Sequence, residues 1–488
     1  MTLGKHRALK KRGVFFCPYQ PRQFLARISI RCIFLVRPAA YLYNGAMKYY
    51  LLKSNRAAVQ RIALLILGLG LFASLMPHRV YGQALYRTHS KYYNIESNLD
   101  RQELKRWAKH MDVVCKSYNQ TFRNYRNQTD HRGRLRMILL KTKADYIQKC
   151  KSFGLNGKAS GGMFFANGKT SGLITWVHDL PESHVIKTLQ HEGFHQFAYH
   201  LIGTGLPLWA NEGMAEYLGD AVLIKRGRSL KVGIADYLRI KAVQKAIKAG
   251  KDIPFGELIY MNSKTWQGNM LNGSSRGSFQ YAQSWSVIYF LIHATDGKRK
   301  KPLYKRALFT YFKHISFGLN NREAFARAFK TTNTRLFHKR WRDYMLKLKP
   351  DANSTAMMKL EFLAGAMQRL FNKRIAKFNQ IAQLKDFLQT IGYRLRKGGH
   401  GGATIIASDH SLYYYQTSKS PEKHDFILSP TEDGTLPPNL STAHLPTNIH
   451  LIWFKNEKGR AVYRILVSNK KPTDKDVKSK KRKKRRRP

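Results

Sequence analysis

Two histidines four residues apart, inside a segment with helical character, constrain this chain more than any other feature. The segment 181–202 contains His191, Glu192 and His195 in the pattern H-E-x-x-H. Residues four apart lie on the same face of a helix, so the two imidazoles can bind one Zn²⁺ ion. Glu192 is placed to reach a zinc-activated water rather than the ion, and it can act as a general base. The motif therefore predicts the metal site of a hydrolase.

The predicted helix 211–223 offers a third ligand. It follows a short turn that contains glycine and proline, so it can double back and place Glu212 opposite the two histidines. Two histidines and one glutamate leave one coordination position open, which is typical of a catalytic zinc. Glu216, one turn further on, can accept a hydrogen bond from a ligand histidine and fix its tautomer. The alternative is a pair of solvated histidines beside a surface acidic pair.

Together the two motifs resemble those of the gluzincin metallopeptidases, in which H-E-x-x-H is followed by a helix of the type N-E-G-x-A. The resemblance is strongest to the uncharacterised, exported bacterial peptidase MA-like family, and it covers residues 90–295 approximately. It implies one zinc ion per chain and hydrolysis of peptide bonds by a metal-activated water. It implies as zinc ligands His191, His195 and Glu212, with Glu192 as the general base and Glu216 as the acid that orients a ligand histidine.

The chain departs from this family pattern before the zinc helix. Aminopeptidases carry a G-x-M-E-N type segment whose acid holds the free amine of the substrate, whereas Gly161, Gly162 and Met163 here are followed by two phenylalanines. Aminopeptidase specificity is therefore not predicted. As an edge strand, this segment is a candidate to bind an extended peptide substrate by β-augmentation. The alternative is an ordinary core strand.

A gluzincin-like mechanism also needs a donor for the developing oxyanion. Tyr281, at the head of the predicted helix 281–294, is the candidate, and aromatic packing at a helix start is the alternative. Three further histidines lie close to the motif in sequence. We interpret them as ordinary histidines rather than ligands, and they are His178, His184 and His200.

The N-terminal part has the order of features expected of a secretory signal. An uncharged apolar run at 62–75 follows Arg56 and Arg61, and small residues at 82–84 suit a cleavage site. The run is short for a membrane-spanning helix, which needs about 20 residues. We therefore predict that 47–84 is a signal peptide, with an uncleaved N-terminal membrane anchor as the alternative. Either way the chain is exported to the periplasm, the cell surface or the medium.

Met47 offers a natural start for this signal, and residues 1–46 are then an extra N-terminal extension. Two of the four cysteines lie upstream of the apolar run, so the exported part keeps Cys115 and Cys150. An exported chain allows these two to pair, and burial as free thiols is the alternative.

The charge is strongly positive, with 87 Lys+Arg against 29 Asp+Glu and a net charge of +58. Such a surface attracts polyanions, and the basic tail 470–488 suits an electrostatic tether to a membrane surface or to anionic envelope polymers. Nucleic acid is disfavoured, because the chain has no recognisable nucleic-acid-binding motif and an export signal. The competing hypothesis to a peptidase is a non-catalytic, zincin-like cationic surface protein that binds anionic envelope polymers.

We predict an α+β fold with a gluzincin-like core, in which a small sheet lies beside the zinc helices. The predicted domains are a metallopeptidase domain at 85–350, a helical linker at 351–397, a small β-rich domain at 398–469 and a disordered polybasic tail at 470–488. The other predicted helices are 99–126, 144–153, 234–249, 301–315, 320–330, 333–347 and 356–392, and the strands lie within 85–98 and at 135–140, 161–166, 171–177, 411–416, 449–454 and 460–467.

Overall fold

The computed structural model describes the part of the chain that contains both metal-ligand motifs. The described residues are 85–123, 133–158, 160–167, 170–178, 180, 182–224, 227–271, 275–297, 299–396, 404–414, 426–431, 434–441, 449–456 and 459–467. The predicted N-terminal extension, signal segment and polybasic tail lie outside them. A membrane-spanning helix is absent from the described part, since none of its helices combines the length and apolar composition that a bilayer crossing requires.

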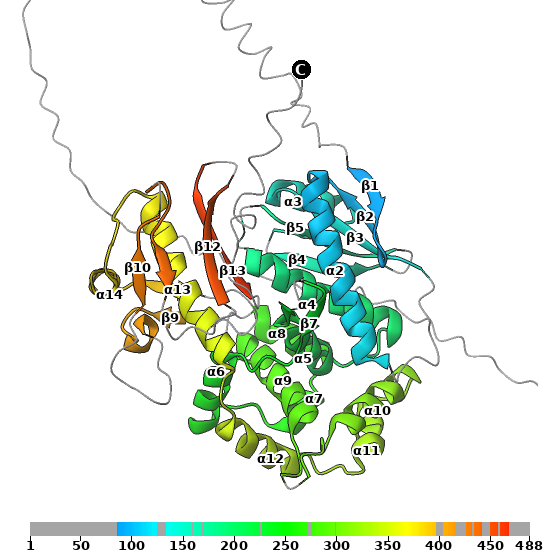
Figure 1. Ribbon diagram of the computed structural model, residues 1–488. Coiled ribbons are helices and arrows are strands. Elements are labelled where there is room, and N and C mark those ends of the chain that lie inside the picture. The colour runs from blue at the N-terminus through cyan, green and yellow to red at the C-terminus, as the bar shows by residue number, and fades with distance from the viewer. Residues whose placement is uncertain are drawn as a thin grey trace, which may run out of the picture. The chain divides into compact units, whose positions relative to one another are not determined.

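A five-stranded mixed sheet, in the order β1-β2-β3-β5-β4, forms the N-terminal layer (Figure 1). Its three central strands β2 (Tyr93–Ser97), β3 (Leu135–Leu140) and β5 (Ser171–Trp176) run parallel to one another. The edge strands β1 (Tyr86–His89) and β4 (Gly162–Ala166) are antiparallel to their neighbours. The predicted small sheet and its strand pair 161–166 with 171–177 are thus confirmed, and so is the α+β class.

Helices cover both faces of this sheet, as the alternation of side chains along β3 requires. Met137 and Leu139 pack in a large core with α2 (Arg101–Thr121) and α4 (Glu182–Leu201). Ile138 and Leu140 instead face a smaller cluster on the side of α3 (Lys143–Ser152). The zinc-motif helix therefore lies directly against one face of the sheet.

The helices after α4 complete the large core. α5 (Leu208–Gly219) packs against α4 and, on another side, against α9 (Ser275–His293). Gly213 makes the second contact possible, because a Cβ at this position would lie 2.6 Å from the Ser284 carbonyl oxygen. The remaining elements of this region are β6 (Val222–Ile224), β7 (Ser229–Lys231), α6 (Tyr237–Lys248), α7 (Phe255–Ile259), α8 (Ser263–Leu271), α10 (Lys305–Ser316), α11 (Asn321–Phe329) and α12 (Thr334–Lys347).

A second hydrophobic cluster forms around α13 (Ala352–Asn372). The helix is buried along much of its length by α14 (Ile381–Thr390) and by short strands, so it is a core element where a linker is predicted. The predicted pair of C-terminal strands is confirmed as the antiparallel hairpin of β12 and β13. The strands of this region are β8 (Arg394–Arg396), β9 (Thr404–Ile406), β10 (Ile427–Ser429), β11 (Asn439–Ser441), β12 (Ile449–Lys455) and β13 (Ala461–Val467).

Three predicted elements differ from the structure. The helix predicted at 211–223 ends at Gly219, because Val222–Ile224 instead pairs as strand β6 with β7. The helix predicted at 356–392 is two helices, α13 and α14. The connection between them contains Arg374 in the left-handed conformation (φ 54°). The strand predicted at 411–416 contains a 3-10 helix, His410–Tyr413, whose start is capped by the side chain of Asp409.

Cys115 and Cys150 are free and buried. Cys115 belongs to the large core on one face of the sheet and Cys150 to the smaller cluster on the other. Burial raises the pKa of Cys115 to about 12 and that of Cys150 to about 11, so both remain thiols at neutral pH. Of the two alternatives that the sequence leaves open, buried thiols are correct.

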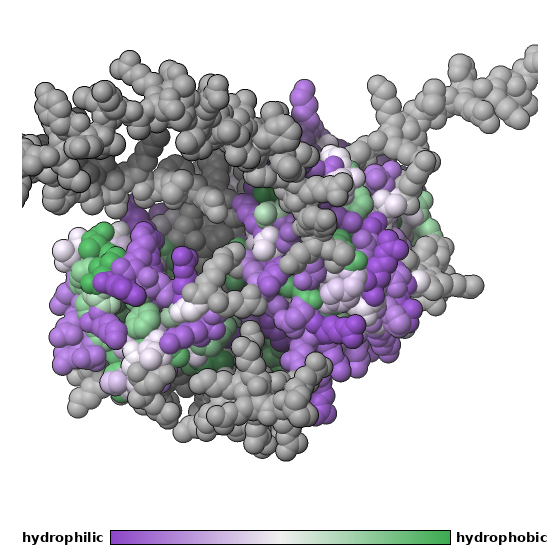
Figure 2. Space-filling view, turned by 90° about the horizontal axis from the view of Figure 1, so that it is seen from above, coloured by the Kyte–Doolittle hydropathy of each residue, from purple (hydrophilic) through white to green (hydrophobic). Residues whose placement is uncertain are grey.

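Apolar side chains are concentrated in these clusters rather than on the surface. On the face shown in Figure 2, hydrophilic residues cover most of the described surface and hydrophobic residues appear in smaller areas between them.

The contact between α5 and α9 leads to a stability prediction. We expect Gly213→Ala to lower the free energy of unfolding by about 1–3 kcal/mol, because the added methyl group meets the rigid backbone of Ser284. Gly268→Ala in α8 is the matched control, since nothing lies within 4 Å of its Cβ position. The control should be stabilising by about 0.5–1 kcal/mol. Equilibrium urea unfolding measures both, and equal effects of the two substitutions would contradict the close packing.

Candidate metal centre

Contacts with α2 and the sheet fix the position of α4. Gly193 allows the close approach of α2, since a Cβ there would lie 2.9 Å from the Met111 Cε atom. The Tyr118 hydroxyl donates to the carbonyl of Gln190, and the Gln196 amide donates to the carbonyl of Arg136 on β3 (2.8 Å). These contacts hold the H-E-x-x-H turn in the interior of the protein.

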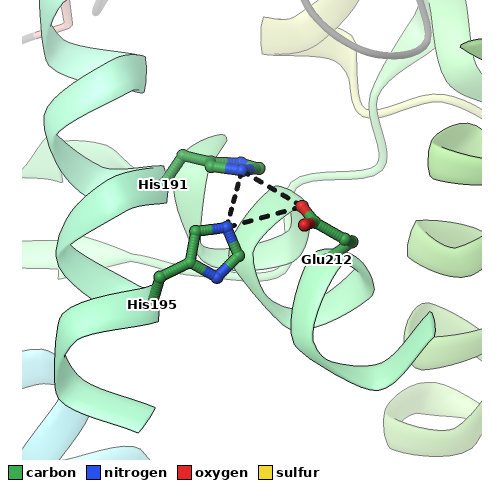
Figure 3. A group of neighbouring side chains, drawn as sticks. All are labelled: His191, His195 and Glu212. Carbon is green, nitrogen blue, oxygen red and sulfur yellow. Dashed lines mark hydrogen bonds and ion pairs between the residues drawn. The ribbon is translucent and has the colours of Figure 1, made fainter. Parts of the chain in front are cut away.

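Three side chains from α4 and α5 converge as predicted (Figure 3). The Nε2 atoms of His191 and His195 are 3.0 Å apart, and each lies 3.4 Å from the Oε2 atom of Glu212. Ligand atoms of a tetrahedral zinc site are spaced by about 3.3 Å, as bond lengths of about 2.0–2.1 Å require. The three side chains are at most 3% exposed. Their spacing and burial therefore fit a single small cation.

The outer nitrogens of the two imidazoles face acceptors. His195 Nδ1 lies 3.0 Å from the Asn211 Oδ1 atom, and His191 Nδ1 lies 3.4 Å from the Glu216 Oε1 atom. Because a carbonyl or carboxylate oxygen only accepts, both contacts favour a proton on Nδ1 and a lone pair on Nε2. When neither imidazole carries a second proton, both lone pairs point toward the Glu212 carboxylate and the centre of the triangle is electron-rich on all sides.

The pKa shifts of the three groups also favour a positive charge among them. Burial lowers the pKa of His191 to about 4, so this imidazole is neutral. Burial acts in the same direction on His195, but the Glu212 carboxylate outweighs it and raises the pKa of His195 to about 9. The imidazoles in turn hold the pKa of Glu212 well below its usual range. A proton on His195 thus supplies the charge that a metal ion would supply instead.

Glu192 is close to the three ligands but is not one of them. Its Oε2 atom accepts a hydrogen bond from the backbone N–H of Phe164 on the edge strand β4 (2.8 Å). Among the described residues its Oε1 atom has no hydrogen-bond partner. Burial raises the pKa of this carboxyl to about 8. One oxygen is thus held by the sheet, and the other remains available to accept a proton.

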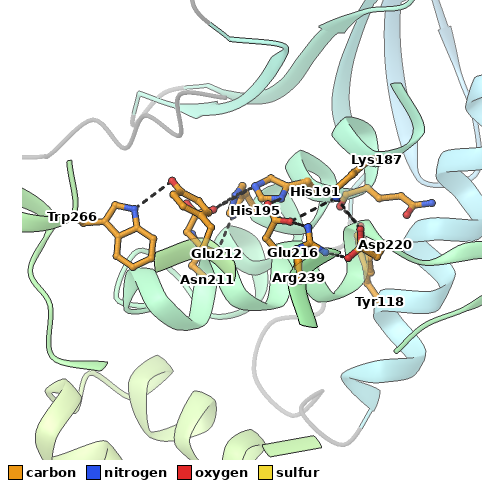
Figure 4. A network of polar contacts seen from close by, with 12 residues as sticks. Tyr118, Lys187, His191, His195, Asn211, Glu212, Glu216, Asp220, Arg239 and Trp266 are labelled. Atoms are coloured by element: carbon orange, nitrogen blue, oxygen red, sulfur yellow. Dashed lines mark hydrogen bonds and ion pairs between the residues drawn. The ribbon is translucent and has the colours of Figure 1, made fainter. Parts of the chain in front are cut away.

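Behind His191 lies a set of buried charges that the sequence analysis did not identify (Figure 4). Glu216, the predicted outer acid, pairs with the guanidinium of Arg239 on α6 as well as facing His191. Arg239 also pairs with Asp220, which in turn pairs with Lys187 on α4 (2.9 Å). In a chain with 87 basic residues, nothing in the pattern around Arg239 separates a buried arginine from a solvated one. Asn211 belongs to the N-E-G motif, but that motif alone does not reveal its contact with His195.

The edge strand β4 packs against α4 at Gly162. A Cβ at Gly162 would lie 2.6 Å from the Thr188 Cγ2 atom of α4, so close packing requires this residue. All five residues of β4 are buried, and Met163 is 3% exposed. The side chains of this segment are therefore those of an ordinary core strand, which is the alternative to a substrate-binding edge strand. Gly161 contributes a carbonyl that accepts from the Thr175 hydroxyl (2.7 Å).

Tyr281 lies inside α9 rather than at its head, because the helix begins six residues earlier at Ser275. The tyrosine is buried, and its hydroxyl accepts a hydrogen bond from the indole N–H of Trp266 (3.3 Å). Trp266 belongs to the network of polar contacts around the centre (Figure 4). The three neighbouring histidines have other contacts. Glu103 pairs with His178, Ser171 contacts His200, and burial lowers the pKa of His184 to about 4.

One family of uncharacterised proteins is similar to the part of the chain that holds this centre. The profile of a family described as "Protein of unknown function (DUF1570)" matches residues 185–304. This stretch begins in α4 and ends after α9, so it contains the three candidate ligands, Glu216 and Arg239. No curated protein matches the sequence. The matched family thus shares the metal-site region, while its description names no activity.

We expect the wild-type chain to bind one divalent ion and to lose it in His195→Ala, because two remaining donors cannot hold a buried ion tightly. His200→Ala, on the same helix and outside the centre, is the control and should bind like the wild type. Elemental analysis after dialysis measures the ion. Added zinc should also raise the melting temperature of the wild type and of the control, but not of His195→Ala. Retention of a full equivalent of metal by His195→Ala would contradict the assignment.

Proposed function

We propose that this protein is an exported, zinc-dependent peptidase of gluzincin type. The observation that carries the proposal is the convergence of His191, His195 and Glu212 at the spacing of a tetrahedral zinc site, with the Glu192 carboxylate held beside them. The small sheet that packs beside α4 is compatible with the α+β core that the resemblance to gluzincins implies.

Zinc is the ion that suits these donors best. Two imidazole nitrogens and one carboxylate oxygen are typical of catalytic zinc, whereas calcium and magnesium prefer six or more oxygen ligands. A zinc ion bound there would lower the pKa of a water molecule and polarise a carbonyl group.

Glu192 would act as the proton acceptor and donor. Its Oε2 atom is anchored by the Phe164 N–H, so the orientation of the carboxylate is fixed before a substrate binds. Its Oε1 atom can take the proton of the attacking water and later give it to the leaving amine. Burial favours the protonated carboxyl, and a cation at the three ligands would favour the carboxylate. Metal binding would therefore convert Glu192 into an active base near neutral pH.

A peptide substrate would lie along the outer edge of β4. The N–H of Phe164 points away from β5 toward Glu192, and backbone groups of alternate residues face the same way in a strand. The backbone of Gly162 therefore lies along the edge that leads to the proposed base. The Phe164 N–H already binds Glu192, and the neighbouring residues of β4 are buried. A substrate strand would therefore pair with this edge only after the side chains that cover it move aside.

Export and a polyanionic contact are the remaining parts of the proposal. The basic, apolar and small residues of 47–84 support export, and the polybasic tail 470–488 supports a tether to anionic envelope polymers or a membrane surface.

Glu192→Gln tests the reaction. We expect this variant to bind zinc like the wild type but to lose peptide hydrolysis by at least about 10²–10⁴-fold, because the amide cannot accept the proton of the water. Digestion of a peptide library followed by mass spectrometry measures the loss and gives the cleavage preference. His200→Ala should cleave at the wild-type rate. A zinc-loaded wild type that cleaves nothing in the library and no unfolded protein, or a fully active Glu192→Gln, would contradict the proposed peptidase.

Tyr281→Phe tests the proposed oxyanion donor. The Trp266 indole N–H donates to the Tyr281 oxygen and so helps to fix the position of the hydroxyl that the proposed mechanism uses as oxyanion donor. We expect kcat to fall by about 10²-fold while KM and zinc affinity stay the same. Trp266→Phe keeps an aromatic ring against Tyr281 and should have a smaller effect. Unchanged kcat in Tyr281→Phe would assign the tyrosine to packing alone.

A further inference from the structure

A row of alternating charges extends from the buried candidate metal centre toward the protein surface. It consists of Glu216 on α5, Arg239 on α6, Asp220 at the end of α5 and Lys187 on α4 (Figure 4). The side chains of Glu216 and Arg239 are 1% and 5% exposed, and only Lys187 reaches solvent appreciably at 28%. Two acids and two bases balance one another, so the row is neutral as a whole.

Arg239 is the central member of this row. One of its terminal nitrogens, Nη2, pairs with the Oε2 atom of Glu216, and the other, Nη1, pairs with the Oδ2 atom of Asp220. The second oxygen of Glu216, Oε1, faces His191 Nδ1 at 3.4 Å. Lys187 Nζ lies 4.0 Å from the same Oε2 atom, but the guanidinium is much closer to it. We therefore infer that the guanidinium mainly sets which way the Glu216 carboxylate is turned, and with it the direction of the acceptor that His191 meets.

We propose that Arg239 is a positioning residue of the metal centre. By holding one oxygen of Glu216, it directs the other toward His191 Nδ1 and so keeps the Nε2 lone pair of His191 aimed at the ion. This inference rests on the proposed zinc site and adds to it a residue on a third helix. An acceptor on the outer nitrogen of a ligand histidine fixes its tautomer and ring direction, and losing such an acceptor weakens metal binding about 10–100-fold.

Arg239 can act in this way because the fold holds it independently of the metal. It lies in the first turn of α6, where its backbone N–H donates to the Asp236 side chain (2.8 Å). The start of α6 is also tied to α13, because the Tyr237 N–H donates to the Ser354 hydroxyl (2.9 Å). The guanidinium lies over the ring of Trp285, 5.6 Å from its centroid. The position of Arg239 thus follows from the packing of α6 against α9 and α13.

The geometry requires arginine rather than any cation. Its planar fork binds two carboxylates through two different nitrogens at fixed angles, whereas a lysine ammonium is a single point of charge on a flexible chain. Lysine at 239 would keep the charge balance of the row but would not pair with Glu216 and Asp220 through two separate nitrogens.

Zinc affinity, measured on the purified full chain by competition with a chromogenic chelator, tests the proposal. We expect Arg239→Gln to weaken zinc binding about 10–100-fold and Arg239→Lys to weaken it as well. Lys245→Gln removes the same charge from an exposed position on the same helix and should bind zinc like the wild type. Circular dichroism and melting of the zinc-free chains show whether each variant is folded, and if Arg239→Gln is not, Arg239→Lys carries the test.

A double-mutant cycle separates positioning from a general structural effect. If Arg239 acts through Glu216, Arg239→Gln should weaken zinc binding little further once Glu216→Gln is present. Losses that multiply, or folded Arg239 variants that bind zinc like the wild type, would overturn the role of Arg239. A wild-type chain that binds no zinc would instead overturn the proposed metal site on which this role depends.

Discussion

The packing of α5 against α4 is the constraint on which the rest of the site depends. It brings the Glu212 carboxylate within 3.4 Å of two imidazole nitrogens that are themselves 3.0 Å apart. Close contacts on both outer sides maintain it, since Gly193 admits α2 and Gly213 admits α9. Larger residues at either position would push one of the two helices away. The convergence of the three groups is therefore a consequence of helix packing.

Burial gives this geometry its chemical significance. The two imidazoles have outer nitrogens that face acceptors, and they meet a carboxylate. All three groups are buried and almost inaccessible to water. Such a set is costly to bury unless a positive charge lies among its members. The Glu212 carboxylate outweighs burial and raises the pKa of His195, which favours a proton in this role, and a zinc ion bound there would replace it. Glu192 is held apart by the sheet, which leaves it available for proton transfer instead of coordination.

Much of this could be predicted from the sequence, because helix geometry places His191 and His195 on one face of a helix and Glu212 and Glu216 on one face of the next, and the short turn between the helices lets them double back. The sheet strands 135–140 and 171–177 were also predictable, since buried β-branched and aliphatic runs are strong local signals. Arg239 and Asp220 were not, because their role arises only when α6 packs beside α5. The helix predicted at 356–392 is likewise interrupted, and the connection between its two parts contains Arg374 in the left-handed conformation, which no local pattern indicates. Tertiary contacts explain the differences in each case.

The most direct test of the central claim is a crystal structure of the zinc-loaded chain with anomalous data collected on both sides of the zinc absorption edge. The account predicts one strong anomalous peak, bonded to His191 Nε2, His195 Nε2 and a Glu212 oxygen at about 2.0–2.2 Å. Glu192 should remain outside bonding distance, with its contact to Phe164 intact. A peak at another place in the protein, or an ion bound through the Nδ1 atoms with Glu212 turned away, would contradict it.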